Sequence, residues 1–414
     1  MMGSKHILIM IFTMFIIFSH LITPSFSYTY ESKLNSSIAL TVMMPMGTPP
    51  QMQRMVLDTG SQLSWVQCRK KNPSFIPNAS SSFSNVACND TVCATQATQI
   101  ADLTIPMNCL HGLCRYSSIF YDGVTVEGNL VRENFTFSSS QITPPMVIGC
   151  SPKKDEMSGA DGMLGMNRGN LSFISQLNES RFSYCVPLCA SSNSNSISSI
   201  SSNSNSNSNC ATGMFYLGDN NHYSSSFRYI NLLDTAQEGQ SMADFDSLAY
   251  YVSLVNISIN GEKLNIVNNK NVVNPNASRE IMIDSGSRHT FLVNATYSAV
   301  REKIVNLTGI HMKETKGVSG IFDMCFKVGS NWSDIKEKIG EVEFEFENGV
   351  KVSIPTERTL DYINDEYGVC VAIGRSDNLG AATNILGYFF QQNLCVDFDI
   401  QRNRVGFGNG DGSN

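Results

Sequence analysis

Short runs of alternating or β-branched apolar residues recur along most of the chain. Clear examples are 38–42 (Ile-Ala-Leu-Thr-Val), 341–346 (Glu-Val-Glu-Phe-Glu-Phe) and 350–354 (Val-Lys-Val-Ser-Ile), and Gly, Asn and Pro separate such runs. A period of two is typical of half-buried strands. Two stretches favour helices: 170–177, which follows a glycine, and 294–306, which brings Tyr297, Val300, Ile304 and Val305 near one face. We therefore predict an all-β protein with a few short helices.

Two segments differ from this pattern. Residues 1–27 have a polar start, an apolar run over 7–18 interrupted only by Thr13, and small residues at Ser25 and Ser27. The run is too short to cross about 30 Å of hydrocarbon, so we interpret 1–27 as a signal peptide rather than an anchor. Residues 190–209 are almost entirely Ser and Asn, which predicts a flexible loop. Cys189 and Cys210 flank it and are candidates for a bridge at its base.

The composition narrows the class of protein. Charged residues make up 16% of the chain, below the usual value of roughly 25%, and the net charge is −7. An acidic, weakly charged surface argues against binding to nucleic acid or to a membrane surface. Four of the twelve cysteines fall in the segment 88–114, and a secreted chain favours disulfides over a zinc site. Eleven Asn-X-Ser/Thr acceptors fit this context, and the glycosylation candidates are Asn78, Asn89, Asn134, Asn256 and Asn276.

One motif occurs twice. The segment 56–61 (Val-Leu-Asp-Thr-Gly-Ser) recurs 226 residues later as 282–287 (Met-Ile-Asp-Ser-Gly-Ser). The segment 162–165 (Gly-Met-Leu-Gly) recurs 222 residues later as 384–387 (Asn-Ile-Leu-Gly). A single Asp-Thr-Gly is no more than a turn, but conserved order and spacing indicate two β-rich lobes that are structural copies. We place the first lobe at 28–219 and the second at 220–414.

The repeat predicts a pair of carboxylates, Asp58 and Asp284, contributed by one lobe each. Two such groups a few Å apart hold one proton between them, so one acts as base while the other acts as acid. They would activate a water molecule without a covalent intermediate. Thr59 and Ser285 are expected to brace the two loops across a pseudo-twofold axis. Gly60 and Gly286 would let backbone amides approach the carboxylates, and Ser61 and Ser287 would hydrogen-bond them.

The chain resembles the pepsin-type aspartic proteases, and in particular the plant nepenthesin-like branch, from about residue 36 to about residue 408. The resemblance rests on the two Asp loops, on 47–51 (Gly-Thr-Pro-Pro-Gln), on Trp65, on the insert 88–114 and on 405–407 (Val-Gly-Phe). It implies a bilobal all-β fold with a cleft, a β-hairpin flap over that cleft, and Asp58 and Asp284 as catalytic dyad. It also implies a bridge between Cys325 and Cys370, while the cysteines of the insert should pair among themselves, with Cys68 or Cys150 as further members.

The flap departs from the family pattern of Tyr, a small residue, Asp and Gly. When Asp122 and Gly123 are aligned, Phe120 occupies the tyrosine position and Tyr121 follows it. Neighbouring strand residues point to opposite faces, so Tyr121 would point away from the cleft unless the hairpin shifts its register. Phe120 could also serve in plain hydrophobic packing. In the family, the tyrosine hydroxyl bonds the tryptophan that Trp65 matches.

Two further departures concern the cleft. Arg288 and His289 follow the second Asp loop, where relatives are mostly polar and neutral. Arg288 either lines the cleft and favours acidic substrates or is a solvated side chain, whereas His289 is expected to pack. Relatives commonly carry a prosegment that blocks the cleft, and the few residues between 27 and the first strand leave no room for one, so we expect no such autoinhibition.

The resemblance implies a secreted aspartic endopeptidase that hydrolyses peptide bonds at acid pH, in the cell wall or the vacuole. The alternative is a catalytically weak or inactive binding or inhibitor protein of the plant cell wall, a kind of family member that usually lacks the dyad. A lectin or structural sandwich would leave the doubled Asp loops unexplained. We expect a monomer with a protein or peptide substrate in an extended cleft, no cofactor, no metal, no nucleic acid, and no membrane association once the signal peptide is removed.

Overall fold

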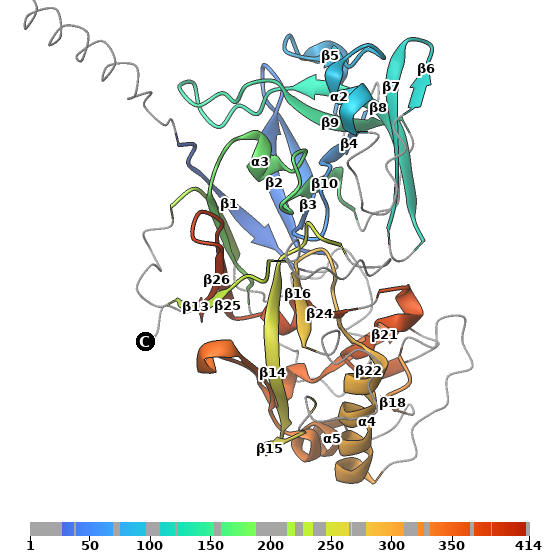
Figure 1. The fold of residues 1–414 in the computed structure, drawn as a ribbon, viewed down its shortest axis with the longest axis vertical. Coiled ribbons are helices and arrows are strands. Elements are labelled where there is room, and N and C mark those ends of the chain that lie inside the picture. The colour runs from blue at the N-terminus through green and yellow to red at the C-terminus, as the bar shows by residue number, and fades with distance from the viewer. Residues whose placement is uncertain are drawn as a thin grey trace, which may run out of the picture.

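The structure is a computed structural model, and it describes fifteen segments of the chain. These are 27–36, 39–68, 75–96, 108–120, 123–152, 159–187, 213–219, 227–234, 246–264, 266, 279–309, 322–326, 332–364, 368–381 and 383–410. Strands dominate these segments and form three sheets. Two β-rich lobes are stacked along the long axis of the molecule (Figure 1). No helix among the described residues has the length and apolarity needed to cross a membrane.

The largest sheet contains fifteen strands. Its order is β13-β26-β25-β11-β12-β1-β2-β3-β10-β4-β9-β8-β7-β6, and β5 pairs with β8. The first-lobe members are β1 (Tyr30–Asn35), β2 (Thr41–Met46), β3 (Gln51–Asp58), β4 (Trp65–Gln67), β5 (Ser84–Asn85), β6 (Asn108–Leu110), β7 (Leu113–Ile119), β8 (Thr125–Glu133), β9 (Met146–Ser151), β10 (Gly162–Gly165), β11 (Arg181–Cys185) and β12 (Gly213–Leu217). The others are β13 (Arg228–Asn231), β25 (Leu394–Asp399) and β26 (Arg404–Asn409).

The second lobe contains an eight-stranded and a three-stranded sheet. The larger has the order β20-β19-β14-β16-β24-β17-β23, and β15 pairs with β14. Its strands are β14 (Tyr251–Ile259), β15 (Glu262–Lys263), β16 (Glu280–Asp284), β17 (Thr290–Leu292), β19 (Val342–Phe346), β20 (Lys351–Ile354), β23 (Ile373–Arg375) and β24 (Asn384–Gly387). The smaller sheet holds β18 (Cys325–Phe326), β22 (Gly368–Val371) and β21 (Leu360–Asn364). The α-helices are α2 (Thr91–Gln96), α3 (Phe173–Gln176), α4 (Asn294–Thr308) and α5 (Trp332–Ile339).

The lobes share one sheet. β11 of the first lobe pairs antiparallel with β25, and β26 continues the sheet to β13, so the last strands of the chain join the first lobe. The disulfide Cys185–Cys395 links β11 to β25 at this place. The assignment of 28–219 and 220–414 as lobes remains a prediction. The shared sheet contains strands of both parts, so the two parts are joined by strand pairing.

The local predictions met mixed outcomes. The all-β class is confirmed, and the runs 341–346 and 350–354 correspond to β19 and β20. Helix α4 confirms the prediction at 294–306, and Tyr297, Val300 and Ile304 are buried on one face, whereas Val305 is only half-buried. The helix predicted at 170–177 is shorter than expected, because only Phe173–Gln176 is helical. The strand predicted at 38–42 begins at Thr41.

Five disulfides join ten cysteines of the described residues. Cys88 pairs with Cys109 and Cys93 with Cys114, as expected for the insert, whereas Cys68 and Cys150 pair with each other and do not join the cysteines of the insert as expected. The bridge between Cys325 and Cys370 joins β18 to β22 and confirms the pairing implied by the resemblance. Cys189 and Cys210 lie outside the described residues, so their pairing stays a prediction.

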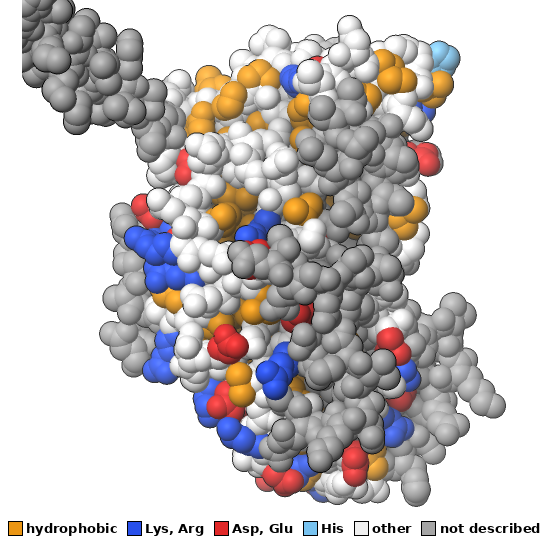
Figure 2. Space-filling view, in the orientation of Figure 1, with side chains coloured by type: hydrophobic (Ala, Val, Ile, Leu, Met, Phe, Trp, Pro, Cys, Tyr) orange, Lys and Arg blue, Asp and Glu red, His pale blue; other side chains and the backbone are white. Residues whose placement is uncertain are grey.

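The surface agrees with the weakly charged composition. On the face shown in Figure 2, charged side chains gather on the second lobe, while the first lobe is mostly uncharged.

The glycosylation candidates Asn78 and Asn89 are exposed, and Asn134 is half-buried. The prediction of a glycan at Asn256 is wrong, because this side chain is 5% exposed on β14 and has no room for one. Asn276 lies outside the described residues.

Candidate active site

The two aspartates end matching strands in the two lobes. β3 is bordered by β2 and by β10, which runs parallel to it and places Gly165 beside Asp58. β16 is bordered by β14 and by the parallel strand β24, which places Gly387 beside Asp284. A strand buried on both faces reads as a continuous apolar run. The runs Val-Leu and Met-Ile that precede the aspartates therefore fix both carboxyl groups at the ends of central strands.

The loops after the aspartates are linked to each other across the lobes. The Thr59 hydroxyl donates to the carbonyl of Ile283 at 2.8 Å, and the Ser285 hydroxyl donates to the carbonyl of Leu57 at 2.7 Å. The backbone N–H of each residue donates to the hydroxyl of the other, at 3.1 Å from Thr59 and 3.0 Å from Ser285. These four hydrogen bonds are buried and nearly symmetric, so the expected brace between the loops is present. They fix the distance between the two aspartates.

Each carboxylate is also held by its own loop in the same way. The Gly60 N–H donates to Oδ1 of Asp58 at 2.8 Å, and the Ser61 hydroxyl donates to Oδ2 at 2.5 Å. In the second lobe the Gly286 N–H and the Ser287 hydroxyl donate to Oδ1 and Oδ2 of Asp284 at 2.8 and 2.5 Å. Both side chains are therefore oriented by two donors each.

The carboxyl groups of Asp58 and Asp284 lie close together, next to the glycines of the two loops. A methyl group added to Gly60 would lie 3.2 Å from Oδ1 of Asp58 and 3.2 Å from Oδ1 of Asp284. A methyl group on Gly286 would lie 2.3 Å from Oδ1 of Asp58, which is closer than atoms can approach. Only glycine fits at position 286, and position 60 is tight for any side chain, because each loop packs against the other lobe's aspartate.

This environment favours a shared proton. Asp58 is 6% and Asp284 is 5% exposed. Burial raises the pKa of Asp58 to about 7, and the charge of Asp284 acts in the same direction. Burial also raises the pKa of Asp284, against the hydrogen bonds from Ser287 and Gly286. The pair can therefore supply one acid and one base at the same pH.

The flap is the hairpin of β7 and β8. Its strands pair from Arg115 and Asn129 to Ile119 and Thr125, and the Phe120 N–H donates to the carbonyl of Val124 at 2.9 Å. Gly123 has a φ of +82°, which suits glycine at this turn. Tyr121 and Asp122 lie outside the described residues, so whether Tyr121 supplies a hydroxyl stays open.

Phe120 lies on the inner face of the flap. Alternate residues of β7 share a face, and Cys114 and Tyr116 are buried in the apolar cluster that contains Trp65. Phe120 continues the alternation 114, 116, 118 and 120, and it packs against the same cluster. This contact agrees with the ungapped alignment, in which Phe120 takes the place of the family tyrosine.

Trp65 belongs to the cluster against which Phe120 packs. Its side chain is 1% exposed, and its indole Nε1 has no hydrogen-bond partner among the described residues. A buried donor without a partner is rare and costs about 1–3 kcal/mol. Phe120 has no hydroxyl to offer this N–H, whereas the tyrosine of the family pattern would supply one.

Arg288 is neither a free cleft charge nor a solvated side chain. Its Nε donates to Oδ2 of Asp361 at 2.9 Å, its Nη1 donates to the Tyr388 hydroxyl at 3.3 Å, and its guanidinium lies 5.3 Å from the ring centre of Phe389. The ring of His289 also contacts Asp361, at 2.8 Å, and packs edge-on against Phe322. Burial acts to raise the pKa of Asp361, but the hydrogen bond with His289 and the charge of Arg288 hold that pKa below its usual range. Local sequence gave no sign of Asp361, because it comes from β21, far along the chain.

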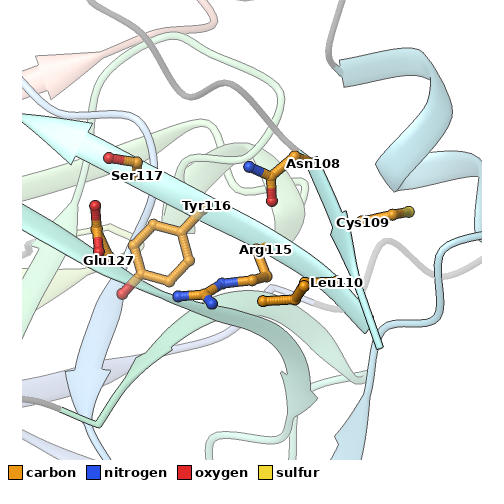
Figure 3. Close-up of a pocket in the computed structure, with 7 residues that line it drawn as sticks. All are labelled: Asn108, Cys109, Leu110, Arg115, Tyr116, Ser117 and Glu127. Atoms are coloured by element: carbon orange, nitrogen blue, oxygen red, sulfur yellow. The ribbon is translucent and has the colours of Figure 1, made fainter. Parts of the chain in front are cut away.

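A separate hollow lies in the first lobe. It has a volume of about 380 Å³ and is built by β6, β7 and β8, next to the Cys-rich insert. Arg115 and Glu127 line it on either side of the Tyr116 ring in the view of Figure 3. It includes no residue of the two Asp loops.

Each lobe contributes one strand and one loop that carry a buried aspartate, and the two loops are linked to each other. This duplicated arrangement defines an aspartic-protease type of site. Family models described as "Xylanase inhibitor N-terminal" and "Xylanase inhibitor C-terminal" match residues 41–224 and 249–409. Aspartic proteinase PCS1 of Arabidopsis thaliana is 31% identical over 405 residues, which are 91% of this chain and 83% of that protein. Aspartic proteinase nepenthesin-1 of Nepenthes gracilis is 29% identical over 376 residues, 88% of this chain and 76% of its own length. The chain belongs to the plant branch of the pepsin-type aspartic proteases.

Solved structures agree on the fold. Basic 7S globulin from soybean has a TM-score of 0.61 and 17% identity, and the match covers 94% of this chain and 100% of the globulin. The structure titled "edgp" has a TM-score of 0.62 and 17% identity, covering 92% of this chain and 94% of the other. The protein therefore has the bilobal pepsin-like fold that the sequence predicts.

Proposed function

We propose that the protein is a secreted aspartic endopeptidase that hydrolyses peptide bonds at acid pH with water activated by Asp58 and Asp284. The observation that carries the proposal is the complete set of symmetric hydrogen bonds around the two buried carboxyl groups. The ionised member of the pair takes a proton from water as that water attacks the scissile carbonyl. The protonated member donates to the carbonyl oxygen, and the proton is returned to the leaving amine.

The substrate is a protein or peptide bound in extended form between the lobes. Extended peptides are recognised mainly through their backbone, which allows several residues to contribute to binding. The raised pKa of Asp58 supports activity in the acid range, because the pair must keep one proton to work. Above the pKa of the pair both carboxyl groups ionise, and the general acid is lost.

Secretion is supported by the N-terminal segment and by the cysteines. Residues 1–27 have the pattern of a signal peptide. Ten described cysteines pair in five disulfides, which persist in an oxidising compartment. Asn78 and Asn89 remain candidates for glycosylation because they are exposed.

A protease-like binding or inhibitor protein of the plant cell wall is the alternative. It is supported by the description of the two matching family models and by the Nε1 of Trp65, which has no hydrogen-bond partner in the described part of the chain. The intact Asp loops favour the enzyme, since a binding protein has no need for two buried carboxyl groups held by matching donors.

The test is incubation of the purified protein with an unfolded protein substrate from about pH 3 to about pH 7, with and without the aspartic protease inhibitor pepstatin. Cleavage that is confined to acid pH and blocked by pepstatin supports the endopeptidase. Absence of cleavage at every pH, in protein shown to be folded, supports the binding protein. Asp284→Asn serves as the matched control, because it keeps the shape of the side chain and removes its proton exchange.

A further inference from the structure

Among the described residues, Tyr28 is the first that the first lobe holds by both its backbone and its side chain. Its backbone N–H donates to Oε1 of Glu179, and the hydroxyl of the preceding Ser27 donates to Oε2 of the same carboxylate at 3.2 Å. The Tyr28 ring packs edge-on against Phe137 with ring centres 6.1 Å apart, and its hydroxyl donates to the carbonyl of Ile142 at 3.4 Å. The backbone and the side chain of this residue are therefore both bound.

The residues around Tyr28 extend this seat. The Thr29 N–H donates to Oε1 of Gln141 at 3.1 Å, and Nε2 of Gln141 donates to the Thr29 hydroxyl at 3.2 Å. Gly218 has a φ of +79°, and a methyl group there would lie 2.7 Å from the Tyr28 carbonyl oxygen. Strand β1 starts at Tyr30 and pairs with β12. The first lobe thus accommodates the chain closely from Tyr28 onward.

Glu179 has no positively charged partner among the described residues. It is half-buried, and burial raises the pKa of its carboxyl group, as does the nearby charge of Asp219. Arg181, two positions further along the chain, donates to Asp219 at 3.0 Å and to Asp397 at 3.0 Å. No Lys or Arg of the described segments forms an ion pair with Glu179. In the part of the chain that the structure describes, its two oxygens bind the neutral donors of Tyr28 and Ser27.

We propose that the signal peptide is cut between Ser27 and Tyr28, and that Glu179 is the binding site for the α-ammonium group released on Tyr28. Hydrolysis by a signal peptidase adds one water: Ser27 leaves with a carboxylate, and the Tyr28 amine takes up a proton. The ammonium group has three N–H donors, so it can replace the lost Ser27 hydroxyl and bind both oxygens. Capture of a terminal amine by a half-buried carboxylate gives a charge-assisted hydrogen bond, roughly twice as strong as a neutral one.

The inference extends the secretion part of the proposed function, and it does not depend on peptidase activity. The cleavage point suggested by the small residues Ser25 and Ser27 and the carboxylate at Tyr28 are independent observations. Together they indicate that processing completes the mature first lobe, because cleavage creates next to Glu179 a positive charge that none of the described residues supplies.

The first experiment expresses the full chain in eukaryotic cells and sequences the N-terminus of the secreted protein. The expected first residue is Tyr28, and any other mature N-terminus overturns the proposal. The second experiment measures urea unfolding, with disulfides intact, of wild type and Glu179→Gln, each before and after selective acetylation of the α-amine. In the free-amine form, Glu179→Gln should raise the unfolding equilibrium constant about fivefold, as expected for a partly buried ion pair. In the acetylated form the two proteins should differ little.

Asp219→Asn is the matched control, because it removes a neighbouring carboxylate that has a side-chain partner of its own. Its effect on unfolding should be the same with a free and with an acetylated amine. An equal effect of Glu179→Gln in both forms would overturn the proposal, since Glu179 would then not sense the terminal charge. If Glu179→Gln is not secreted, free and acetylated wild type are compared directly, and equal stability overturns it. Neither readout uses peptide cleavage by this protein, so the result is separate from that of the proposed function.

Discussion

Restoring a hydroxyl to the flap should speed the proposed reaction. Phe120 packs against the cluster that contains Trp65, whose Nε1 is buried without a partner among the described residues. Phe120→Tyr adds an acceptor on that face. A hydrogen bond formed in this way contributes a net gain of about 1 kcal/mol, after the cost of desolvating the hydroxyl. If the bond orders the flap in the transition state, kcat/KM should rise about fivefold.

The assay is cleavage of a synthetic peptide at the pH optimum, with kcat and KM measured separately. Tyr121→Phe is the matched control and should change kcat/KM little. Trp65→Phe closes a double-mutant cycle: without the indole N–H, the gain from Phe120→Tyr should disappear. The reasoning is refuted if Phe120→Tyr has no effect while Tyr121→Phe cripples the enzyme. The hairpin would then use a register in which Tyr121 is the flap tyrosine.

Three further predictions concern acidic side chains. Asp58→Asn or Asp284→Asn should reduce peptide cleavage below about one-hundredth of wild type while circular dichroism stays unchanged; a higher residual rate would exclude acid–base catalysis by this pair. Folding raises the pKa of Asp58 from its ordinary value of 3.8 to about 7, so protonated Asp58 stabilises the folded state. This contribution to the free energy of unfolding is fully present below pH 3.8 and is lost as the pH rises through about 7. Asp58→Asn should therefore melt above wild type near pH 7, and the two melting temperatures should converge on acidification; a gap that is independent of pH would contradict the linkage. Asp361→Asn should lower kcat about tenfold with little change in KM, because Arg288 next to the second Asp loop loses its anchor. Asp397→Asn, at another buried carboxylate that binds an arginine, should lower the melting temperature but leave kcat unchanged, and equal kinetic effects of the two variants would argue against a positioning role.

The dyad could be predicted because its signal is local and doubled. An apolar run followed by Asp, a small hydroxylic residue and Gly encodes a strand end and a tight loop, and the second copy supplies the partner. The same local logic located α4, whose apolar residues repeat with helical spacing. It placed Phe120 on the inner face of the flap, since the alternation of a strand does not depend on distant contacts.

Other features lie beyond local patterns. The ion pair between Arg288 and Asp361 joins residues 73 positions apart, and only the packing of β21 against the second Asp loop brings them together. The pairing of β11 with β25 depends on closure of the whole second lobe, so neither strand reveals its partner. The helix predicted at 170–177 is limited to Phe173–Gln176, with Ser172 as its N-cap, because the residues before it continue the tight loop after β10.

The bridge between Cys185 and Cys395 closes a ring of chain with a sequence separation of 210. The second lobe is held inside this ring, so both of its ends stay attached to the first lobe even when it unfolds. A chain tethered at both ends has less conformational freedom to lose when it folds again. A single cut within the ring would leave both pieces covalently joined, and they would separate on a gel only after reduction. The protein would thereby survive such a cut as one covalently joined molecule.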